Sequence, residues 1–109
     1  MGQTIVQINF SLNVSGAEYE QAVAPLAQPM ADLAGLQWKI WLLNEEAHTA
    51  GGIYLFADAD SARAFLDGPM IAQVKVAPIL GNFSARLYGV AGELSAITRA
   101  PLGEAVRAA

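Results

Sequence analysis

The sequence is short of several residue types, and each shortage excludes a class of chemistry. Its 109 residues include no cysteine, so a disulfide framework, a thiolate nucleophile and a zinc–thiolate site are excluded. One histidine, with no clustered carboxylates beyond Glu45 and Glu46, makes no credible metal site. The Gly51-Gly52 pair lacks the context of a phosphate-binding loop, and no serine lies in a nucleophile elbow. We therefore expect no cofactor.

Charge is also scarce, which limits the partners that the surface can attract. Only 15% of the residues are charged, against about 25% in an average protein. The net charge is −4 and the six basic residues are scattered, so we expect neither a nucleic-acid partner nor a membrane partner. No apolar run approaches the roughly 20 residues that span a bilayer, and no signal peptide is visible. These features predict a cytoplasmic protein.

What the chain has in quantity is apolar surface. Its length predicts a single domain over residues 1–109, and 54% of the residues are hydrophobic. Such a domain buries roughly two-thirds of its unfolded surface. This composition is apolar for so small a domain, and it indicates surface that a monomer would leave exposed.

The hydrophobic pattern predicts four strands and two helical regions. In chain order, it predicts a strand over 3–13, a helix over 17–33, strands over 36–43 and 53–57, short helices over 61–66 and 70–76, and a last strand over 82–93. Ser15 and Glu18 predict a capping box at the start of the first helix. Pro29 predicts a kink or break just before it, and Gly35 is a suitable C-cap. The segment Asp58-Ala59-Asp60 predicts a turn and an N-cap.

This order is that of the split βαβ, or ferredoxin-like, α+β fold, with a four-stranded antiparallel sheet covered by helices on one face. An antiparallel sheet with one solvated face should alternate between apolar and polar residues. The second strand instead has Trp38, Ile40 and Leu42 on one side and Trp41 and Leu43 on the other. We expect a homodimer that covers the helix-free face.

Several segments resemble the YdhR-like family of monooxygenases, in the dimeric α/β-barrel superfamily. The segments that carry the resemblance are Trp38-Lys39-Ile40-Trp41, His48, Ala50-Gly51-Gly52-Ile53-Tyr54-Leu55-Phe56, Pro25-Leu26-Ala27, Ser61-Ala62 and Glu93-Leu94-Ser95-Ala96-Ile97. The resemblance implies that two ferredoxin-like protomers pack sheet to sheet, and it implies a relation to cofactor-independent monooxygenases that act on aromatic polyketides. Pro29 and the tail 103–109 depart from the family pattern.

The hairpin around His48 contains the candidate catalytic residues. His48 has the only side chain whose ordinary pKa lies near neutrality, so it is the candidate proton acceptor, with Tyr54 or Asn44 orienting a substrate oxygen. The alternative for His48 is a solvated turn residue. The candidate substrate-binding residues are Trp38, Trp41, Phe56, Phe65, Tyr88 and Arg86. The aromatic residues fit equally an ordinary core and dimer interface, and Arg86 fits an exposed strand position or an inter-subunit ion pair.

Three functions fit these residues. The first is a cofactor-independent monooxygenase that oxidises a small phenol- or polyketide-like aromatic with O₂. The second is a cofactor-free isomerase or cyclase, and the third is a non-catalytic dimer that binds a small aromatic ligand. Fold alone does not decide among them, whereas oxygen uptake separates the first from the second. Independently, the few apolar residues of the tail from Leu94 to Leu102 predict that it packs on the core or on a partner.

Overall fold

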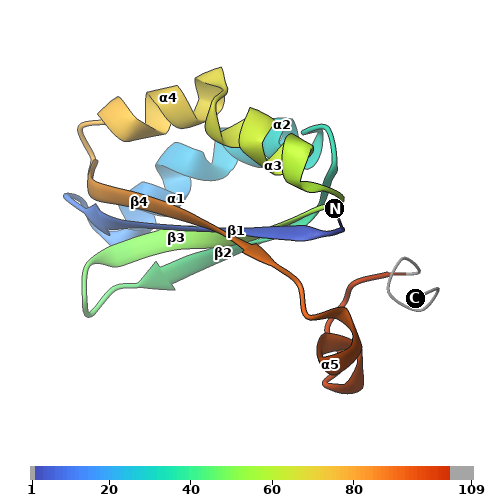
Figure 1. The fold of residues 1–109 in the computed structure, drawn as a ribbon. Helices are drawn as coiled ribbons and strands as arrows, with labels where there is room; N and C mark the ends of the chain where they lie inside the picture. The colour runs from blue at the N-terminus through green and yellow to red at the C-terminus, as the bar shows by residue number, and fades with distance from the viewer. Residues whose placement is uncertain (1, 104–109) are drawn as a thin grey trace.

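The computed structural model describes residues 2–103 and shows the expected ferredoxin-like fold (Figure 1). The elements are β1 (Thr4–Leu12), α1 (Gly16–Val23), the 3₁₀ helix η1 (Ala24–Leu26), α2 (Ala27–Ala31), β2 (Leu36–Asn44), β3 (Thr49–Phe56), α3 (Ala59–Leu66), α4 (Pro69–Val76), β4 (Leu80–Gly89) and α5 (Gly92–Ile97). The strands form one antiparallel sheet in the order β2-β3-β1-β4. Helices α1 to α4 cover one face, and α5 projects from the opposite side.

The alternation in β1 fixes which face of the sheet is covered. Val6, Ile8, Phe10 and Leu12 are all buried under the helices. The register aligns Ile8 with Gly52 on β3, so the even positions of β3 share this face. The covered face of the sheet therefore forms the floor of the core, as the alternation predicts.

The predicted first helix is interrupted earlier than expected. Pro25 lies in η1, whereas Pro29 lies in the first turn of α2. A proline is tolerated in a first turn because the backbone N–H there has no intrahelical acceptor. The break predicted before Pro29 is therefore present, but it lies at η1, around Pro25, and not next to Pro29. The capping box is confirmed, because the Ser15 side chain accepts from the Glu18 backbone N–H and the Glu18 side chain accepts from that of Ser15.

The hairpin strands are longer than the sequence predicts. The segment 44–52 between the two predicted strands contains only a short turn, because β2 ends at Asn44 and β3 begins at Thr49 rather than Ile53. Gly51 and Gly52 pair within the ladder, and a Cβ on Gly51 would collide with the carbonyl oxygen of Ile8. The two glycines thus allow close approach of strands, which a composition-based prediction takes for a turn.

The end of the sheet also differs from the prediction. β4 stops at Gly89 rather than Glu93, because Gly89 pairs with Thr4, the first residue of its only neighbouring strand. The chain beyond then forms α5.

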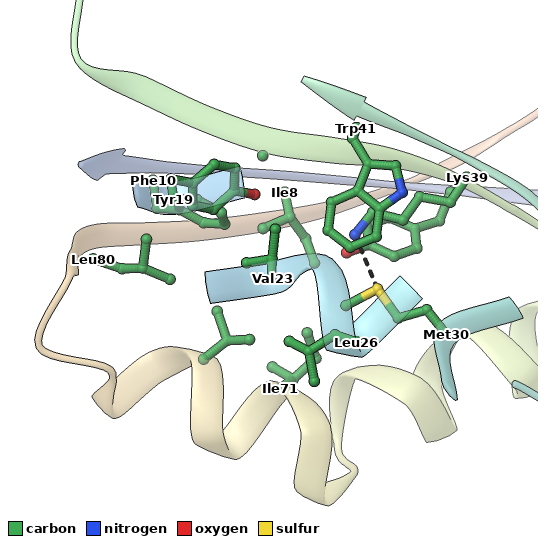
Figure 2. Close-up of a pocket in the computed structure, with 13 residues that line it drawn as sticks. Ile8, Phe10, Tyr19, Val23, Leu26, Met30, Lys39, Trp41, Ile71 and Leu80 are labelled. Carbon is green, nitrogen blue, oxygen red and sulfur yellow. Dashed lines mark hydrogen bonds between the residues drawn. The ribbon is translucent and has the colours of Figure 1, made fainter. Parts of the chain in front are cut away.

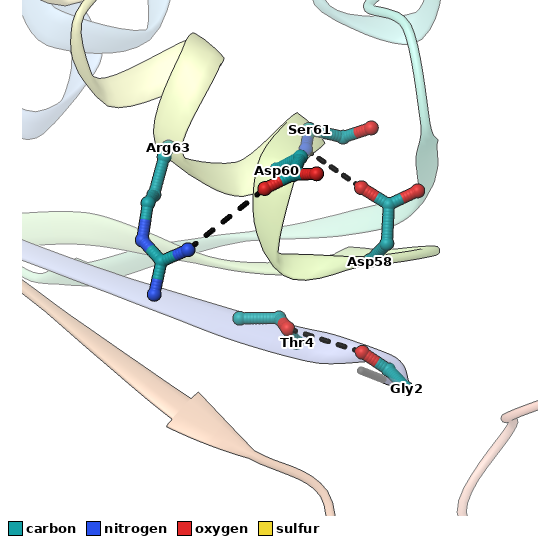
Figure 3. A network of polar contacts seen from close by, with 6 residues as sticks. All are labelled: Gly2, Thr4, Asp58, Asp60, Ser61 and Arg63. Atoms are coloured by element: carbon teal, nitrogen blue, oxygen red, sulfur yellow. Dashed lines mark hydrogen bonds and ion pairs between the residues drawn. The ribbon is translucent and has the colours of Figure 1, made fainter.

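The N-cap predicted at Asp58 is confirmed. The Asp58 side chain caps α3 by accepting a hydrogen bond of 2.7 Å from the Ser61 backbone N–H, and this hydrogen bond lowers the pKa of Asp58 (Figure 3).

The helix-free face is partly covered by the segment that contains Pro101 and Leu102. Trp38 Nε1 donates to the Pro101 carbonyl oxygen at 2.7 Å, and Gln3 Nε2 donates to the Leu102 carbonyl oxygen at 2.8 Å. Leu102 is buried, which confirms the docking prediction for that residue. Leu94 and Ile97 on α5 are 70% and 74% exposed. Among residues 2–103, no helix is long and apolar enough to cross a membrane.

Candidate functional site

A small cavity lies between the covered face of the sheet and helices α1, α2 and α4 (Figure 2). Its volume is about 30 Å³, which accommodates one or two water-sized molecules. The lining residues are Ile8, Phe10, Tyr19, Val23, Leu26, Met30, Lys39, Trp41, Gly51, Tyr54, Ile71, Val74 and Leu80. All but one of these residues are uncharged, and most are apolar.

The exception is Lys39, which extends from β2 into the cavity. Its Nζ lies 3.0 Å from Met30 Sδ, 3.2 Å from the centre of the Trp41 ring and 4.6 Å from the centre of the Tyr54 ring. The thioether is a weak acceptor, and the two rings offer cation–π contacts. Within the described part of the chain, no carboxylate forms an ion pair with Lys39. The ammonium is therefore held without a counter-ion.

Burial changes the protonation of the groups around this cavity. Desolvation lowers the pKa of Lys39 to about 7, because an apolar site disfavours the charged amine. The same effect raises the pKa of Tyr54, with a smaller contribution from Tyr19, and it raises the pKa of Tyr19, with a smaller contribution from Glu20. At neutral pH the site thus combines an amine that can gain or lose a proton with two phenols that retain theirs.

Gly52 provides the space in which the Lys39 side chain lies. Gly52 pairs with Trp41 on β2, and a Cβ at this position would lie 2.8 Å from Lys39 Cε and 3.0 Å from Tyr54 Cε1. Both distances are too short for ordinary van der Waals contact. A side chain at position 52 would therefore displace the lysine from its position between the two rings.

Trp41 separates the cavity from two larger recesses. A groove of about 310 Å³ lies on the outer side of its ring, lined by Tyr19, Glu20, Val23, Ala24, Ala27, Trp41, Leu42 and Leu43. A second recess of about 190 Å³ lies between α2 and β2, and Lys39 and Met30 reach it too. Trp41 alone borders all three spaces, and its side chain is on the margin of the fold, 37% exposed.

The structure brings some of the predicted site residues together. Tyr54 and Trp41 both line the cavity. Phe56 and Phe65 are fully buried behind Tyr54, with ring centres of Phe65 and Tyr54 at 4.8 Å and of Phe65 and Phe56 at 5.5 Å. These two phenylalanines set the position of Tyr54 and do not border the cavity themselves.

The remaining predicted residues lie elsewhere. His48 is exposed in the β2–β3 turn, with a φ of 55° in the left-handed region, and the Asn44 side chain accepts a hydrogen bond of 3.0 Å from the Ala47 backbone N–H in the same turn. Trp38, Arg86 and Tyr88 belong to the helix-free face. None of these five residues borders the cavity.

The sequence interpretation missed Lys39, Tyr19 and Met30. The sequence did contain a signal for Lys39. It is the one charged residue in the apolar strand Leu36–Leu43, and it lies two positions from Trp41, on the same face of the strand. A charge at a core-facing position needs an explanation.

Among residues 2–103, no three histidine or acidic side chains are grouped as metal ligands would be.

The fold and the cavity define a ferredoxin-like α+β domain with an apolar site between its sheet and its helix layer. The family model described as "Putative mono-oxygenase ydhR" matches residues 5–101, and the chain belongs to this family. The resemblance inferred from the hairpin motifs is thereby confirmed. No match was found among curated protein sequences.

Solved structures share the same fold at low identity. SnoaB, a cofactor-independent oxygenase from Streptomyces nogalater, is 18% identical with a TM-score of 0.66, over 83% of this chain and 94% of its own. The heme-degrader MhuD from Mycobacterium tuberculosis is 19% identical with a TM-score of 0.62, over 80% and 95%. A dimeric ferredoxin-like protein of unknown function from Thermobifida fusca is 22% identical with a TM-score of 0.61, over 83% and 93%. At these identities the likeness shows the fold alone.

Proposed function

We propose that this protein is a cofactor-independent monooxygenase that oxidises a small phenol- or polyketide-like aromatic with O₂. The observation that carries the proposal is an aromatic cavity with one charged group, Lys39, in a chain that belongs to a mono-oxygenase family. The similarity of the fold to that of SnoaB, a cofactor-independent oxygenase, supports the same reading. The cavity and its adjoining groove are the substrate site.

The size and lining of the groove suit one or two fused rings. At about 310 Å³ it lies at the lower end of the usual range for small-molecule sites. Val23, Leu42 and Leu43 provide apolar contacts, and the Trp41 indole provides a flat surface on which a ring can stack. The Tyr54 hydroxyl, which keeps its proton because burial raises its pKa, can donate a hydrogen bond to a substrate oxygen.

The proposed chemistry needs no external reductant. A ring methylene that tautomerises to an enol or phenol loses a proton, and the resulting anion gives one electron to O₂. The carbon radical and superoxide then form a C–O bond, and the protonated hydroperoxide loses water. One CH₂ group and one O₂ become one C=O group and one water, so one oxygen atom enters the product. The protein's task is to bind the ring, remove the first proton and stabilise the anion.

His48 and Asn44 remain proposed members of this machinery, although both lie in an exposed turn. From there they can act only after a movement of the turn or on a site completed by a second subunit. The variant His48→Ala tests this role directly: turnover that matches the native protein removes His48 from the mechanism.

The proposed assembly is a homodimer in which the helix-free sheet faces pack together. Ile40 and Tyr88 on this face are each 49% exposed, and α5, which projects on the same side of the sheet, has Leu94 and Ile97 exposed. The likeness to a dimeric ferredoxin-like protein supports the same assembly. The cytoplasmic location remains a prediction from the sequence.

Oxygen uptake is the experiment that tests the function. Anthrone is a suitable probe, because it is a fused-ring aromatic with an acidic ring methylene. We expect the purified, chelator-dialysed protein to consume one O₂ for each anthraquinone formed, well above the rate in buffer. Trp41→Ala should slow turnover because it removes the stacking surface. If a broad panel of phenols and anthrones consumes no oxygen, the monooxygenase proposal fails: an isomerised product then indicates an isomerase, and an unchanged bound ligand indicates a binding protein.

A further inference from the structure

We propose that the Lys39 amine is the catalytic base of this site: it takes the acidic hydroxyl proton of the aromatic substrate, and the resulting ammonium then holds the oxyanion. The Trp41 indole acts as the gate that must leave the Lys39 amine before the substrate can reach it. This inference rests on the proposed function, because it assigns a residue and a ligand class, an acidic phenol or enol, to the same site.

The Lys39 amine has no counter-ion among residues 2–103. Of these residues Lys39 is also the only charged one that lines the cavity, and its amine contacts a thioether and two rings rather than a carboxylate. Burying an amine in this way destabilises the fold, since burial without a charged partner is not compensated. Methionine or leucine would fill the same space with a smaller loss of folding stability. The arrangement is suited to an anion that arrives with the ligand.

The surrounding structure also makes room for the Lys39 side chain. Gly52 lacks the Cβ that would press on Lys39 Cε, and the rings of Trp41 and Tyr54 lie against the amine. Phe65 packs against Tyr54 from behind, with ring centres 4.8 Å apart. The amine is therefore held at a defined point in the cavity. Gly52 leaves space for it, and the two rings, which are supported by the core, contact it.

Among the described residues, two phenols and no carboxylate share the cavity with the amine. Tyr54 faces it from β3, Tyr19 lies across the cavity on α1, and Glu20 borders only the outer groove. The residues that α2 and α4 contribute to the cavity, Met30, Ile71 and Val74, carry no charge. With no acidic group in the cavity, desolvation lowers the pKa of Lys39 to about 7. An amine with this pKa is in part free to accept a proton at neutral pH.

The substrate reaches the Lys39 amine from the groove beyond Trp41. The cavity of about 30 Å³ cannot hold an aromatic ring, whereas the groove of about 310 Å³ beyond Trp41 can. Because Trp41 is the only residue that borders both the cavity and both recesses, its rotation joins the three spaces. Its ring centre lies 3.2 Å from the amine nitrogen, so an entering phenol must displace the indole before its hydroxyl can hydrogen-bond to the neutral amine.

The step is a proton transfer with no change of oxidation state. The substrate O–H bond breaks, its electron pair stays on oxygen, and a new N–H bond forms on Nζ. A neutral phenol and a neutral amine become a phenolate and an ammonium that attract each other. The later reaction of the anion with O₂ returns this proton to the peroxide oxygen, and Lys39 is again neutral.

The test uses three variants of the full chain. Lys39→Met removes the amine at similar volume, and Lys39→Arg keeps a cation that cannot be deprotonated. Lys75→Met removes an exposed lysine on α4 and is the control for loss of one charge. The probe is 4-nitrophenol, whose phenolate has its own visible absorption band, so the spectrum reports the ionisation of the bound form. Circular dichroism confirms that each variant is folded.

In the native protein and in Lys75→Met, we expect 4-nitrophenol to bind as the phenolate at a pH below its pKa in solution. In Lys39→Met, phenolate binding should weaken by about 10- to 100-fold, the range for losing a charge-assisted hydrogen bond. In Lys39→Arg, phenolate binding should persist while anthrone turnover falls by roughly 10²- to 10⁴-fold, the contribution of a general base.

Two results would overturn the assignment. One is phenolate binding in Lys39→Met equal to that of the native protein. The other is native turnover of anthrone in Lys39→Arg. If the native protein itself consumes no oxygen with anthrone, the proposed function fails instead, and the nitrophenol spectra still decide whether Lys39 is the anion site.

A fluorescence measurement tests the gate, first without ligand and then with 4-nitrophenol. Trp38→Phe leaves Trp41 as the only tryptophan, so its fluorescence reports on the amine beside it. We expect an emission change with a midpoint near pH 7 that disappears when Lys39→Met is added, and a red shift when 4-nitrophenol displaces the indole toward solvent. Emission that is independent of both pH and ligand would contradict the gate.

Discussion

Lys39 shows how a single residue can be costly for stability and useful for function. It occupies a core-facing position on β2, and Trp41 and Leu43 lie on the same face of that strand. Desolvation lowers the pKa of Lys39 because burial penalises the charged amine, and the two ring contacts only partly offset that cost. Sites of this kind commonly trade stability for activity.

The first stability prediction follows from the direction of this shift. The pKa of Lys39 is about 7 in the folded chain and 10.5 for an ordinary lysine, so the unfolded chain binds more protons between those two pH values. Stability of the native chain therefore rises with pH across that window, and the full penalty is present below pH 7. Lys39→Met should raise the free energy of unfolding by about 2–4 kcal/mol at pH 6, with a gain that fades towards pH 10.5.

Urea denaturation at pH 6 and pH 10, at one protein concentration, measures this difference. Lys75→Met is again the control, because Lys75 is exposed and should change stability by no more than about 0.5 kcal/mol at either pH. Equal gains for Lys39→Met at the two pH values would show that the amine is not held at a depressed pKa.

Among the elements, the segment after β4 behaves in two different ways. Residues Pro101 and Leu102 return to the helix-free face, where their carbonyl oxygens accept hydrogen bonds from Trp38 and Gln3. Helix α5 lies between β4 and Pro101 along the chain, and its residues Leu94 and Ile97 are exposed to solvent on this protomer. The tail therefore docks through its last described residues, and α5 is left available for a second chain.

The second prediction concerns this docking. Leu102 is only 6% exposed, so Leu102→Ala should lower the free energy of unfolding by about 2 kcal/mol and the melting temperature by several degrees. Val76→Ala on the open side of α4, where the residue is 79% exposed, is the control and should have little effect. Thermal unfolding compares the two, and an unchanged melting temperature for Leu102→Ala would mean that the segment does not dock. We also expect loss of residues 103–109 to be nearly neutral, and residues 104–109 lie outside the described part of the chain.

At the scale of the whole molecule, the two faces of the sheet differ in what covers them. Helices α1 to α4 cover one face, whereas on the other Pro101 accepts a hydrogen bond from Trp38 and, among the described residues, Ile40 and Tyr88 stay half exposed. Exposed apolar surface of this extent commonly marks an interface. The proposed sheet-to-sheet dimer would bury it, on the order of 2,000 Å² or more for a stable assembly.

The third prediction tests this assembly with a matched pair of charges. Ile40→Lys places an ammonium in the proposed interface and should convert a dimer to a monomer in size-exclusion chromatography with light scattering. Val76→Lys makes the same type of change on the helix layer and should leave the mass unchanged. A native chain that is a monodisperse monomer at micromolar concentration would end the dimer proposal.

The order and type of the main elements were determined by the sequence alone, because they depend on local patterns. Alternation in β1, the capping box at Ser15 and the Asp58 cap each involve residues a few positions apart. The hairpin motif likewise identified the family, and alternation placed Trp38 and Trp41 on opposite faces. The errors fell at element boundaries such as Gly51-Gly52, where pairing with a distant strand outweighs local glycine preference.

The site was decided by the tertiary structure, because it joins residues that are far apart in sequence. His48 was chosen for its ordinary pKa, but the turn places it in solvent. Lys39 acquires a pKa near 7 only when Tyr54 and Trp41 enclose it, Met30 approaches from α2 and Gly52 leaves it room. Desolvation depends on what surrounds a group in space, and a single sequence does not contain that surrounding until the sheet and helices have packed.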